Sequence, residues 1–285
     1  MIRTALLLAL ILAAPASAQP RGQIPDPPPA PVPVLQSETI RRYKAPEASQ
    51  GVAVDARHFY AVSNSRIAKY GKVSGTKISE WTGERARFPH LNSCEIIGSE
   101  LVCANSNFPD VPMTSSVEFF DPVRMVHLRT ASLGQQVGSL TWVDRRDGAW
   151  FAAFANYDER GGEPGRDHRF SQLVQYDDQW RRMQAWSFPA GVLARFKPTS
   201  SSGGGFGDDG LLYVTGHDHT ELYVLRLPKG SSILDHVATI NVPVEGQAIA
   251  FDKSQRRVLF GISRPNREVI SMRLPPISAK PVTAP

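Results

Sequence analysis

The sequence predicts an all-β fold, a single β-propeller of five four-stranded blades closed by an N-terminal strand. Long helical periodicity is absent, whereas short runs of β-branched and aromatic residues separated by turn residues occur throughout the chain. These runs form five similar copies at a spacing of roughly 41 to 65 residues, close to the length of a propeller blade. A four-stranded antiparallel meander repeated around an axis is the architecture that this pattern favours.

The clearest copy begins in residues 200–228, SSSGGGFGDDGLLYVTGHDHTELYVLRLP. A first strand ends at Phe206, a tight turn follows at 208–210, and the strand LLYVTG leads to a polar corner that begins at His217. The strand ELYVLRLP and a fourth strand near 233–242 complete the blade. The glycines that open this copy lack the Lys-Ser/Thr ending of a phosphate-binding loop, so we interpret them as a close backbone approach at the crowded axis.

The other copies are recognised by their first strands, which begin at Gly51, Asn92, Gly138 and Gly246. The last copy has no fourth strand of its own, but residues 37–44 precede the first copy and belong to no other blade. Pairing this segment with the last blade closes the ring and covers an open sheet edge. Six blades, with irregular strands hidden in a long loop, and two small β domains are the alternatives.

The two ends of the chain are predicted to lie outside the propeller, which spans residues 37–275. Residues 1–18 have the pattern of a signal peptide, with Arg3 before an apolar run and an Ala-Ser-Ala cleavage signature. Because the apolar run is shorter than the roughly 20 residues of a membrane anchor, we expect an exported protein, periplasmic or secreted. Residues 19–36 are rich in proline and are interpreted as a linker, and residues 276–285 as a C-terminal tail.

Charge and composition limit the classes of partner. The formal net charge is +5, but the lysines and arginines are scattered and no basic run is interleaved with aromatic residues. We therefore expect no nucleic-acid partner, and no membrane association once the signal peptide has been removed. The expected protein is a monomer with a small-molecule or carbohydrate ligand, and its cofactor is unknown from the sequence.

The two cysteines are predicted to face each other across a hairpin. In CEIIGSELVC, a two-residue turn at Gly98-Ser99 places Cys94 opposite Cys103, at a non-hydrogen-bonded pair where the strands approach most closely. A disulfide is possible at this spacing, and an exported protein meets an oxidising compartment. We favour the disulfide over two reduced, buried thiols.

The connections of a meander predict where a binding site lies. Loops that lead into first strands and loops that join second to third strands lie at the same end of every sheet, and we call this end the polar face. A concave site lined by convergent polar groups is the expected binding site. The candidate ligand-binding residues on this face are Gln50, Asn64, Asn92, Asn105, Asn156, Asp218, His219, Gln247 and Arg264.

Two long insertions also belong to the polar face. They span residues 107–115 and 158–171, and each joins a second strand to a third strand. Loops of this length on a compact scaffold are often functional. The alternative is that they pack over the neighbouring blade and contact no ligand.

His217 and His90 are the candidate catalytic residues. Strand alternation would turn His217 and His219 the same way, on either side of Asp218. An imidazole can act as a general acid or base near neutral pH. Together with His90, the cluster could instead bind a divalent metal. Alternatively, its side chains could stabilise a tight corner by hydrogen-bonding to backbone groups. We assign no metal ligand.

The sequence also bears on two other kinds of catalytic site, those of serine hydrolases and of glycosidases. No G-x-S-x-G elbow is present, so a serine hydrolase of that type is not indicated. A glycosidase needs two carboxylates at a set separation, and carbohydrate hydrolysis stays open because several carboxylates could supply the pair. These are Glu95, Asp110, Asp158, Asp218 and Glu245.

Several strings together resemble a known family: HLNS, NSNFPDVPMTSSVEFFD, GSLTWVDRRDG, FANYDERGGEPGRDHR, GHDHTELYVLRLP and GQAIAFD. They are similar to exported bacterial propellers that often carry the label cycloisomerase and are related to lactonase-like propellers. The resemblance covers residues 51–275. It implies a propeller fold and chemistry on lactones or cyclic acids, although the lactonising propellers behind the label are larger and have seven blades.

Two functional hypotheses follow. In the first, the polar face binds a small polar, sugar-like or lactone ligand, and His217 or His90 moves protons in an isomerase, lyase or hydrolase reaction. In the second, the same face of a non-enzymatic propeller recognises a protein or polymer. Because propellers host many unrelated functions, the fold does not choose between the two hypotheses.

Overall fold

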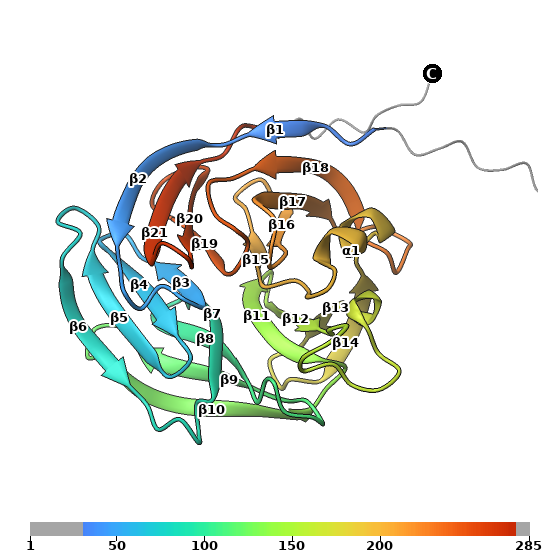
Figure 1. The fold of residues 1–285 in the computed structure, drawn as a ribbon, viewed down its shortest axis with the longest axis horizontal. Coiled ribbons are helices and arrows are strands. Elements are labelled where there is room, and N and C mark those ends of the chain that lie inside the picture. The colour runs from blue at the N-terminus through green and yellow to red at the C-terminus, as the bar shows by residue number, and fades with distance from the viewer. Residues whose placement is uncertain (1–30, 278–285) are drawn as a thin grey trace, which may run out of the picture. The chain divides into compact units, whose positions relative to one another are not determined.

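The computed structural model describes residues 31–277 and shows five blades of four strands around a central axis, one of which has a fifth strand added at its outer edge (Figure 1). The five-bladed propeller predicted from the sequence is therefore confirmed, and the alternative of six blades is wrong. The predicted signal peptide 1–18 lies outside the described residues, as do most of the linker and of the tail. No helix within 31–277 is long and apolar enough to cross a membrane.

Each blade is an antiparallel meander whose first strand lies next to the axis. Blade I comprises β3 (Gly51–Val54), β4 (His58–Ser63), β5 (Arg66–Gly71) and β6 (Lys77–Thr82). Blade II comprises β7 (His90–Ile97), β8 (Glu100–Ser106), β9 (Thr114–Asp121) and β10 (Val126–Gln135). Blade III comprises β11 (Ser139–Arg146), β12 (Ala149–Ala155), β13 (Gln172–Tyr176) and β14 (Arg182–Ser187).

The last two blades include strands from the N-terminal region. Blade IV comprises β15 (Gly203–Phe206), β16 (Leu212–Thr215), β17 (Glu221–Arg226) and β18 (Asp235–Asn241), with β1 (Val34–Gln36) added outside β18. Blade V comprises β19 (Ile249–Phe251), β20 (Val258–Ser263), β21 (Glu268–Arg273) and β2 (Glu38–Lys44). The closure by an N-terminal strand is thus as predicted, because β2 pairs antiparallel with β21.

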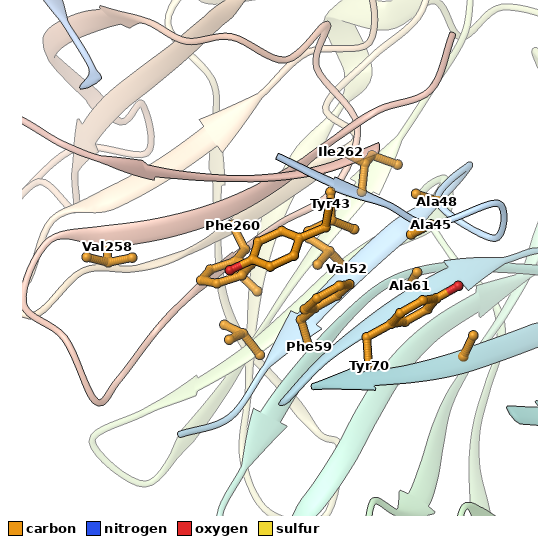
Figure 2. Packing of buried hydrophobic residues seen from close by; sticks show 14 residues of the cluster. Tyr43, Ala45, Ala48, Val52, Phe59, Ala61, Tyr70, Val258, Phe260 and Ile262 are labelled. Atoms are coloured by element: carbon orange, nitrogen blue, oxygen red, sulfur yellow. The ribbon is translucent and has the colours of Figure 1, made fainter. Parts of the chain in front are cut away.

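Closure of the ring is reinforced by an aromatic contact between the two ends of the chain. Tyr43 on β2 packs against Phe59 of blade I, with ring centroids 4.7 Å apart, and against Phe260 of blade V at 6.2 Å (Figure 2). A buried aromatic ring contributes about 1.5–3 kcal/mol. Tyr43 therefore joins the last blade to the first through apolar contact as well as through the strand ladder.

The prediction of a linker over 19–36 is wrong for its last three residues. Val34, Leu35 and Gln36 form β1, which pairs in parallel with Thr239–Asn241 of β18. These residues follow Pro33, the last proline of the run, so their backbone N–H groups are free to join a ladder. The edge of β18 is covered in this way (Figure 1).

The hydrophobic core lies between the blades. Each of the five buried clusters combines side chains from the facing sides of two neighbouring blades. Near the axis the backbones themselves approach, as expected for the glycines of blade IV. A Cβ atom at Gly203 would lie 2.5 Å from the carbonyl oxygen of Gln247 on the next blade, so this position tolerates no side chain.

The hairpin with the two cysteines forms in the predicted register. Cys94 pairs with Cys103, their Cα atoms are 4.1 Å apart, and the two residues form a disulfide. Both cysteines are buried in the cluster between blades I and II.

Two short helical segments were not predicted. The 3₁₀ helix η1 (His168–Phe170) ends the long loop of blade III, and α1 (Ala190–Phe196) lies between β14 and β15. Val192 and Phe196 of α1 are buried between blades III and IV. The helix thereby fixes the segment that follows it, residues 197–202, at the polar face.

Candidate functional site

A cavity of about 220 Å³ lies at the polar face. Its walls come from all five blades and from the segment after α1, so no single blade could form it. The lining residues are Gln50, His90, Asn92, Phe108, Tyr157, Glu159, Arg160, Pro198, Thr199, Ser202, His217 and Gln247. Five of the eleven predicted site residues are among them: Gln50, His90, Asn92, His217 and Gln247.

Three amide side chains form the buried part of the cavity. Gln50 precedes β3, Asn92 lies on β7 and Gln247 precedes β19; their exposed fractions are 8%, 5% and 4%. Amides both donate and accept hydrogen bonds without carrying charge. The cavity is thus lined, at its buried end, by neutral groups that suit hydroxyl or carbonyl groups of a ligand.

Gln247 is held in an uncommon backbone conformation. Its φ is +67°, in the left-handed region that non-glycine residues rarely adopt. Its N–H donates to the carbonyl oxygen of Gly216 at 3.2 Å, and its carbonyl oxygen accepts from Oγ1 of Thr215 at 2.5 Å. These two hydrogen bonds connect the segment before blade V to the corner of blade IV that carries His217.

His90 is held as a neutral imidazole. Its Nδ1 lies 3.1 Å from Oδ1 of Asn64. Because an amide oxygen only accepts, Nδ1 carries the proton and Nε2 is an acceptor. Burial, and to a lesser extent the positive charges of Arg264 and Arg160, lower the pKa of His90 to about 4. Asn64, predicted as a ligand contact, does not line the cavity and positions His90.

An aromatic wall borders the cavity. His90 packs against Phe108 with centroids 5.0 Å apart, and Phe108 packs against Tyr157 at 4.9 Å. Phe108 belongs to the insertion of blade II and Tyr157 directly precedes the insertion of blade III. Burial raises the pKa of Tyr157 to about 12, so the phenol is neutral. The wall offers an apolar surface to one side of a bound ring.

His217 and Asp218 form an oriented pair at the cavity. Nδ1 of His217 lies 2.6 Å from Oδ1 of Asp218, and Oγ1 of Thr199 donates to Oδ2 of Asp218 at 2.8 Å. Burial alone would raise the pKa of Asp218, but the hydrogen bonds from His217 and Thr199 lower it overall. The carboxylate therefore fixes the proton of His217 on Nδ1 and leaves Nε2 as a proton acceptor.

The expectation that His217 and His219 point the same way rested on strand alternation, which this corner does not have. Residues 217–220 lie between β16 and β17 and are bends rather than strand, so side-chain alternation does not apply there. His217 lines the cavity whereas His219 does not. Arg264 is exposed in the β20–β21 turn and is also outside the lining, although its charge acts on His90.

Asn105 and Asn156, predicted as ligand contacts, do not line this cavity, and each is hydrogen-bonded within the protein. Nδ2 of Asn105 donates to the backbone oxygen of Arg87 and to Oγ of Ser116, and its Oδ1 accepts from the N–H of His90. Asn156 is fully buried, and its Nδ2 donates to the backbone oxygens of Val137 and Phe170. Both amides hold loops of the polar face in place.

The long insertions have both of the roles that were considered. Their beginnings, or the residues just before them, supply Phe108, Tyr157, Glu159 and Arg160 to the cavity. Farther along, Oε1 of Glu163 accepts from the N–H of Met113 at 2.7 Å, which joins the two insertions. Sequence reasoning missed the four lining residues because each lies in an irregular loop, where no periodicity shows which side chain points inward.

One group of acidic and imidazole side chains has a spacing that could hold a metal ion. Ligand atoms of Asp158, Asp167 and His168 lie within 4.8 Å of one another. Each is already engaged: Nδ1 of His168 lies 2.5 Å from Oδ1 of Asp158, and Asp167 forms an ion pair with Arg169. These contacts stabilise the blade III insertion, which explains why the three side chains lie close to one another.

A second buried cluster lies toward the opposite end of the first strands. Glu95 of β7 is buried, and its Oε1 forms a 3.0 Å ion pair with Lys253. Burial raises the pKa of Glu95 to about 7, although Lys253 acts in the opposite direction. Burial also raises the pKa of Asp144, which accepts from the N–H of Phe206 at 2.8 Å. The end of the first strands opposite the polar face therefore also carries buried charged groups.

Four of the five carboxylates considered for a glycosidase pair each have a different partner, and the fifth, Asp110, is exposed. Glu95 pairs with Lys253, Asp158 with His168 and Asp218 with His217, and Oε1 of Glu245 accepts from Oγ of Ser263. Of these carboxylates only Asp218 contacts a residue of the cavity lining through its side chain. The cavity presents one oriented imidazole rather than two facing carboxyl groups.

The fold and the cavity together define a five-bladed β-propeller with a small polar cavity at one end of its axis. No protein-family model matches the chain, and no curated protein sequence matches it significantly. The resemblance to exported propellers labelled cycloisomerase is thus supported for the propeller fold, while the activity in that label stays an expectation.

Solved structures are similar to this chain at low sequence identity. A chain of the mitotic checkpoint complex is 11% identical with a TM-score of 0.46, covering 95% of this chain and 99% of that chain. Hydrazine synthase of Kuenenia stuttgartiensis is 11% identical with a TM-score of 0.47, covering 79% and 83%. The Cps50 (Swd1) propeller domain of Myceliophteria thermophila is 11% identical with a TM-score of 0.40, covering 79% and 84%. Likenesses of this degree assign neither a family nor an activity.

Proposed function

We propose that this propeller binds a small polar, sugar-like or lactone ligand in the cavity of the polar face, and that His217 acts there as a general base. The observation that carries the proposal is the convergence of three buried amides from three blades on the same cavity as an imidazole oriented by Asp218. Neutral polar groups at the buried end and a proton acceptor in the wall are the components of a small-molecule site.

The size of the cavity limits the ligand. A volume of about 220 Å³ corresponds to roughly seven water molecules of liquid. Pockets for drug-sized ligands are larger, at about 300–1,000 Å³. The cavity therefore suits a single small ring, such as one monosaccharide or one lactone, with Phe108 and Tyr157 against its apolar side.

The chemistry follows from the protonation states of the two histidines. His217 presents Nε2 as a base, and Asp218 stabilises the imidazolium that forms when a proton is taken. His90 has a pKa of about 4 and is neutral at pH 7, so it serves as a hydrogen-bond acceptor for the ligand rather than as an acid. Isomerase, lyase and hydrolase reactions can all begin with proton transfer to a base such as His217.

Binding is tested first, with the chain from Gln19 onward. Differential scanning fluorimetry and isothermal titration calorimetry are run with D-glucose, D-galactose, D-xylose, D-glucuronate, D-galacturonate and D-gluconolactone. At least one compound is expected to raise the melting temperature and to bind wild type but not the variant Gln247→Ala. If none of the compounds binds, the proposed function fails and the alternative of a protein or polymer partner is favoured.

Turnover is tested with each compound that binds. Proton NMR follows its conversion by wild type and by the variants His217→Gln and His219→Gln. The second variant is the matched control, because His219 lies in the same corner but outside the cavity. Loss of conversion in His217→Gln alone supports the general-base role; equal conversion by His217→Gln and wild type contradicts it.

A further inference from the structure

A groove lies at the end of the propeller opposite the polar face, where blade V meets blade I. Its volume is about 680 Å³, and none of its lining residues belongs to the cavity of the polar face. Tyr43 and Phe260, whose rings lie side by side in Figure 2, are among the residues that line it. The groove therefore exists only because the N-terminal strand β2 completes blade V.

Three aliphatic side chains at the groove are exposed to solvent. Val73, Ile78 and Ile40 are 89%, 57% and 47% exposed, and Val73 is the most exposed large hydrophobic residue within 31–277. Ile40 is the extra residue of a β-bulge, so no residue of β21 lies opposite it. Single exposed aliphatic residues are common on protein surfaces, whereas several around one groove are typical of a surface that contacts another molecule.

The charged residues that line the groove are all basic. They are Arg41, Arg57, His58 and Lys72, and no aspartate or glutamate is among the lining residues. The carboxylates of the two bordering turns are already engaged, Asp55 by His58 and the buried Asp252 by Lys72. Within residues 31–277, neither Arg41 nor Arg57 forms an ion pair, so two positive charges at the groove have no acidic partner.

Arg41 is held in place without any partner molecule. Its Nη1 donates to the backbone oxygens of Lys72 at 3.3 Å and Val73 at 2.8 Å, and its Cζ lies 4.7 Å from the ring centroid of Tyr43. In the described part of the chain, its Nε and Nη2 donate to no group. A guanidinium pairs with a carboxylate through two parallel hydrogen bonds, and a side chain that is already fixed loses little entropy on binding.

We propose that this groove binds an acidic segment of a partner protein, with aliphatic side chains of the segment against Ile40, Val73 and Ile78 and a carboxylate paired with Arg41. Complementary charge identifies the partner as acidic, and the exposed aliphatic residues require apolar side chains between its carboxylates. The inference is independent of the proposed function, because the two sites share no lining residue.

An anionic lipid surface is the other partner that a basic and apolar surface could contact. Lipid headgroups are recognised by clusters of about four to eight lysines and arginines. The groove has three such residues, and the charge of one of them, Lys72, is compensated by Asp252. A peptide segment needs fewer cations, so the observations favour it over a membrane.

The test begins with a library of short random peptides displayed on phage and selected on the chain from Gln19 onward. We expect enrichment of peptides that combine several carboxylates with aliphatic residues. The most enriched peptide is synthesised with a fluorescein label, and its affinity is measured by fluorescence anisotropy. Raising NaCl from about 50 to about 300 mM should weaken binding about tenfold, because salt screens exposed charges.

Two double variants locate the binding site. Arg57→Gln with Val73→Ser changes only exposed side chains of the groove and should bind the peptide about tenfold more weakly than wild type. Val123→Ser with Arg124→Gln is the matched control, because these exposed residues lie in the corresponding turn of blade II and outside the groove. The control should bind like wild type, and both variants should melt within a few degrees of wild type.

A single variant tests the role of Arg41. Arg41→Lys keeps the positive charge but not the two parallel hydrogen bonds to a carboxylate, so it should also bind the peptide about tenfold more weakly. If this variant melts well below wild type, the double variants of exposed residues decide the question alone.

The outcomes that overturn the proposal are specific. They are enrichment of neutral or basic peptides, enrichment of no peptide, and equal affinity of the two double variants for the selected peptide. Co-sedimentation with vesicles of phosphatidylcholine and phosphatidylglycerol tests the lipid alternative. If only vesicles bind, and the groove variant weakens that binding, the partner is a membrane. The groove variant should bind any compound from the sugar screen like wild type, so the failure of either proposal is seen separately.

Discussion

Nδ1 of His217 lies 2.6 Å from Oδ1 of Asp218, at the edge of a cavity whose other walls come from the four other blades. The carboxylate is held on its other side by Thr199, which follows helix α1. The orientation of this imidazole thus depends on packing between blades III and IV and on the sequence of the corner itself.

The first prediction concerns Asp218. Replacement by Asn removes the charge that stabilises the imidazolium and favours the wrong tautomer of His217. We expect kcat for a substrate found by the screen to fall by about 10²–10⁴-fold, by analogy with the effect of this change in a Ser-His-Asp site. Affinity for the ligand should change little. Calorimetry on Asp218→Asn checks this, and a large loss of affinity with unchanged kcat would contradict it.

The second prediction concerns the pH dependence of stability through His90. Its pKa is about 4 in the folded protein and about 6.5 when unfolded. Between these values the unfolded state binds more protons, so the contribution of His90 to stability is lost as pH falls from 6.5 to 4. From pH 5 to pH 7, wild type should gain about 1–2 kcal/mol of unfolding free energy relative to His90→Gln. Urea unfolding at both pH values measures the difference, and parallel pH profiles would disprove it.

The third prediction concerns Glu95, whose effect on the pH dependence of stability is opposite in sign to that of His90. The pKa of Glu95 is raised to about 7 in the folded protein, against the ordinary value of 4.5. Between these values the folded state binds more protons, so the stabilisation by protonated Glu95 is lost as pH rises from 4.5 to 7. Relative to Glu95→Gln, wild type should lose about 2 kcal/mol from pH 5 to pH 7. Urea unfolding of the pair provides the test; a difference that grows with pH would be inconsistent with a raised pKa.

The fourth prediction concerns the disulfide. Cys94 and Cys103 are separated by 9 positions, and closing a loop of this length in the unfolded chain is worth about 2–3 kcal/mol in the loop-entropy model. The double variant Cys94→Ser, Cys103→Ser should lose at least that much unfolding free energy, since two buried sulfurs are replaced by hydroxyls. Reduction of wild type with dithiothreitol should produce a similar loss. Mass spectrometry of the alkylated protein, with and without reductant, reports the oxidation state directly.

The fifth prediction concerns ring closure. Tyr43→Ala removes the ring that lies against Phe59 and Phe260, and truncation of a buried aromatic residue costs about 3–5 kcal/mol. Tyr43→Phe keeps the ring and loses only the hydrogen bond to the backbone oxygen of Lys72, so it should cost about 1 kcal/mol. Chemical unfolding distinguishes the two. Equal losses in both variants would mean that the hydroxyl, and not the ring, stabilises the closure.

Local sequence patterns were sufficient for the fold. The period-two runs, the turn residues between them and the unassigned strand at residues 37–44 predicted five blades and their closure, and the Gly98-Ser99 turn set the register that joins Cys94 to Cys103. Strand β1 was missed because its three residues follow a proline run. Only the free edge of β18, formed about 200 residues later in the chain, gives it a partner.

The cavity was only partly predictable. Meander connectivity placed Gln50, Asn92 and Gln247 at one end of the propeller, and the structure brings these three amides together with His90 and His217. Meander connectivity could not show that Asn105 and Asn156 form hydrogen bonds with nearby backbone groups. Those contacts depend on where the loops fold back, which strand periodicity does not determine.

The sequence by itself determined the five-bladed ring, the disulfide pair and the end of the ring where polar groups gather, because each depends on contacts between neighbours in a short repeating pattern. Only the tertiary structure decided which polar groups share a cavity, which of two histidines is oriented by a carboxylate, and which buried amide oxygens lack a partner. These properties arise where loops from different blades meet, and their geometry is fixed by packing between segments that are distant in sequence.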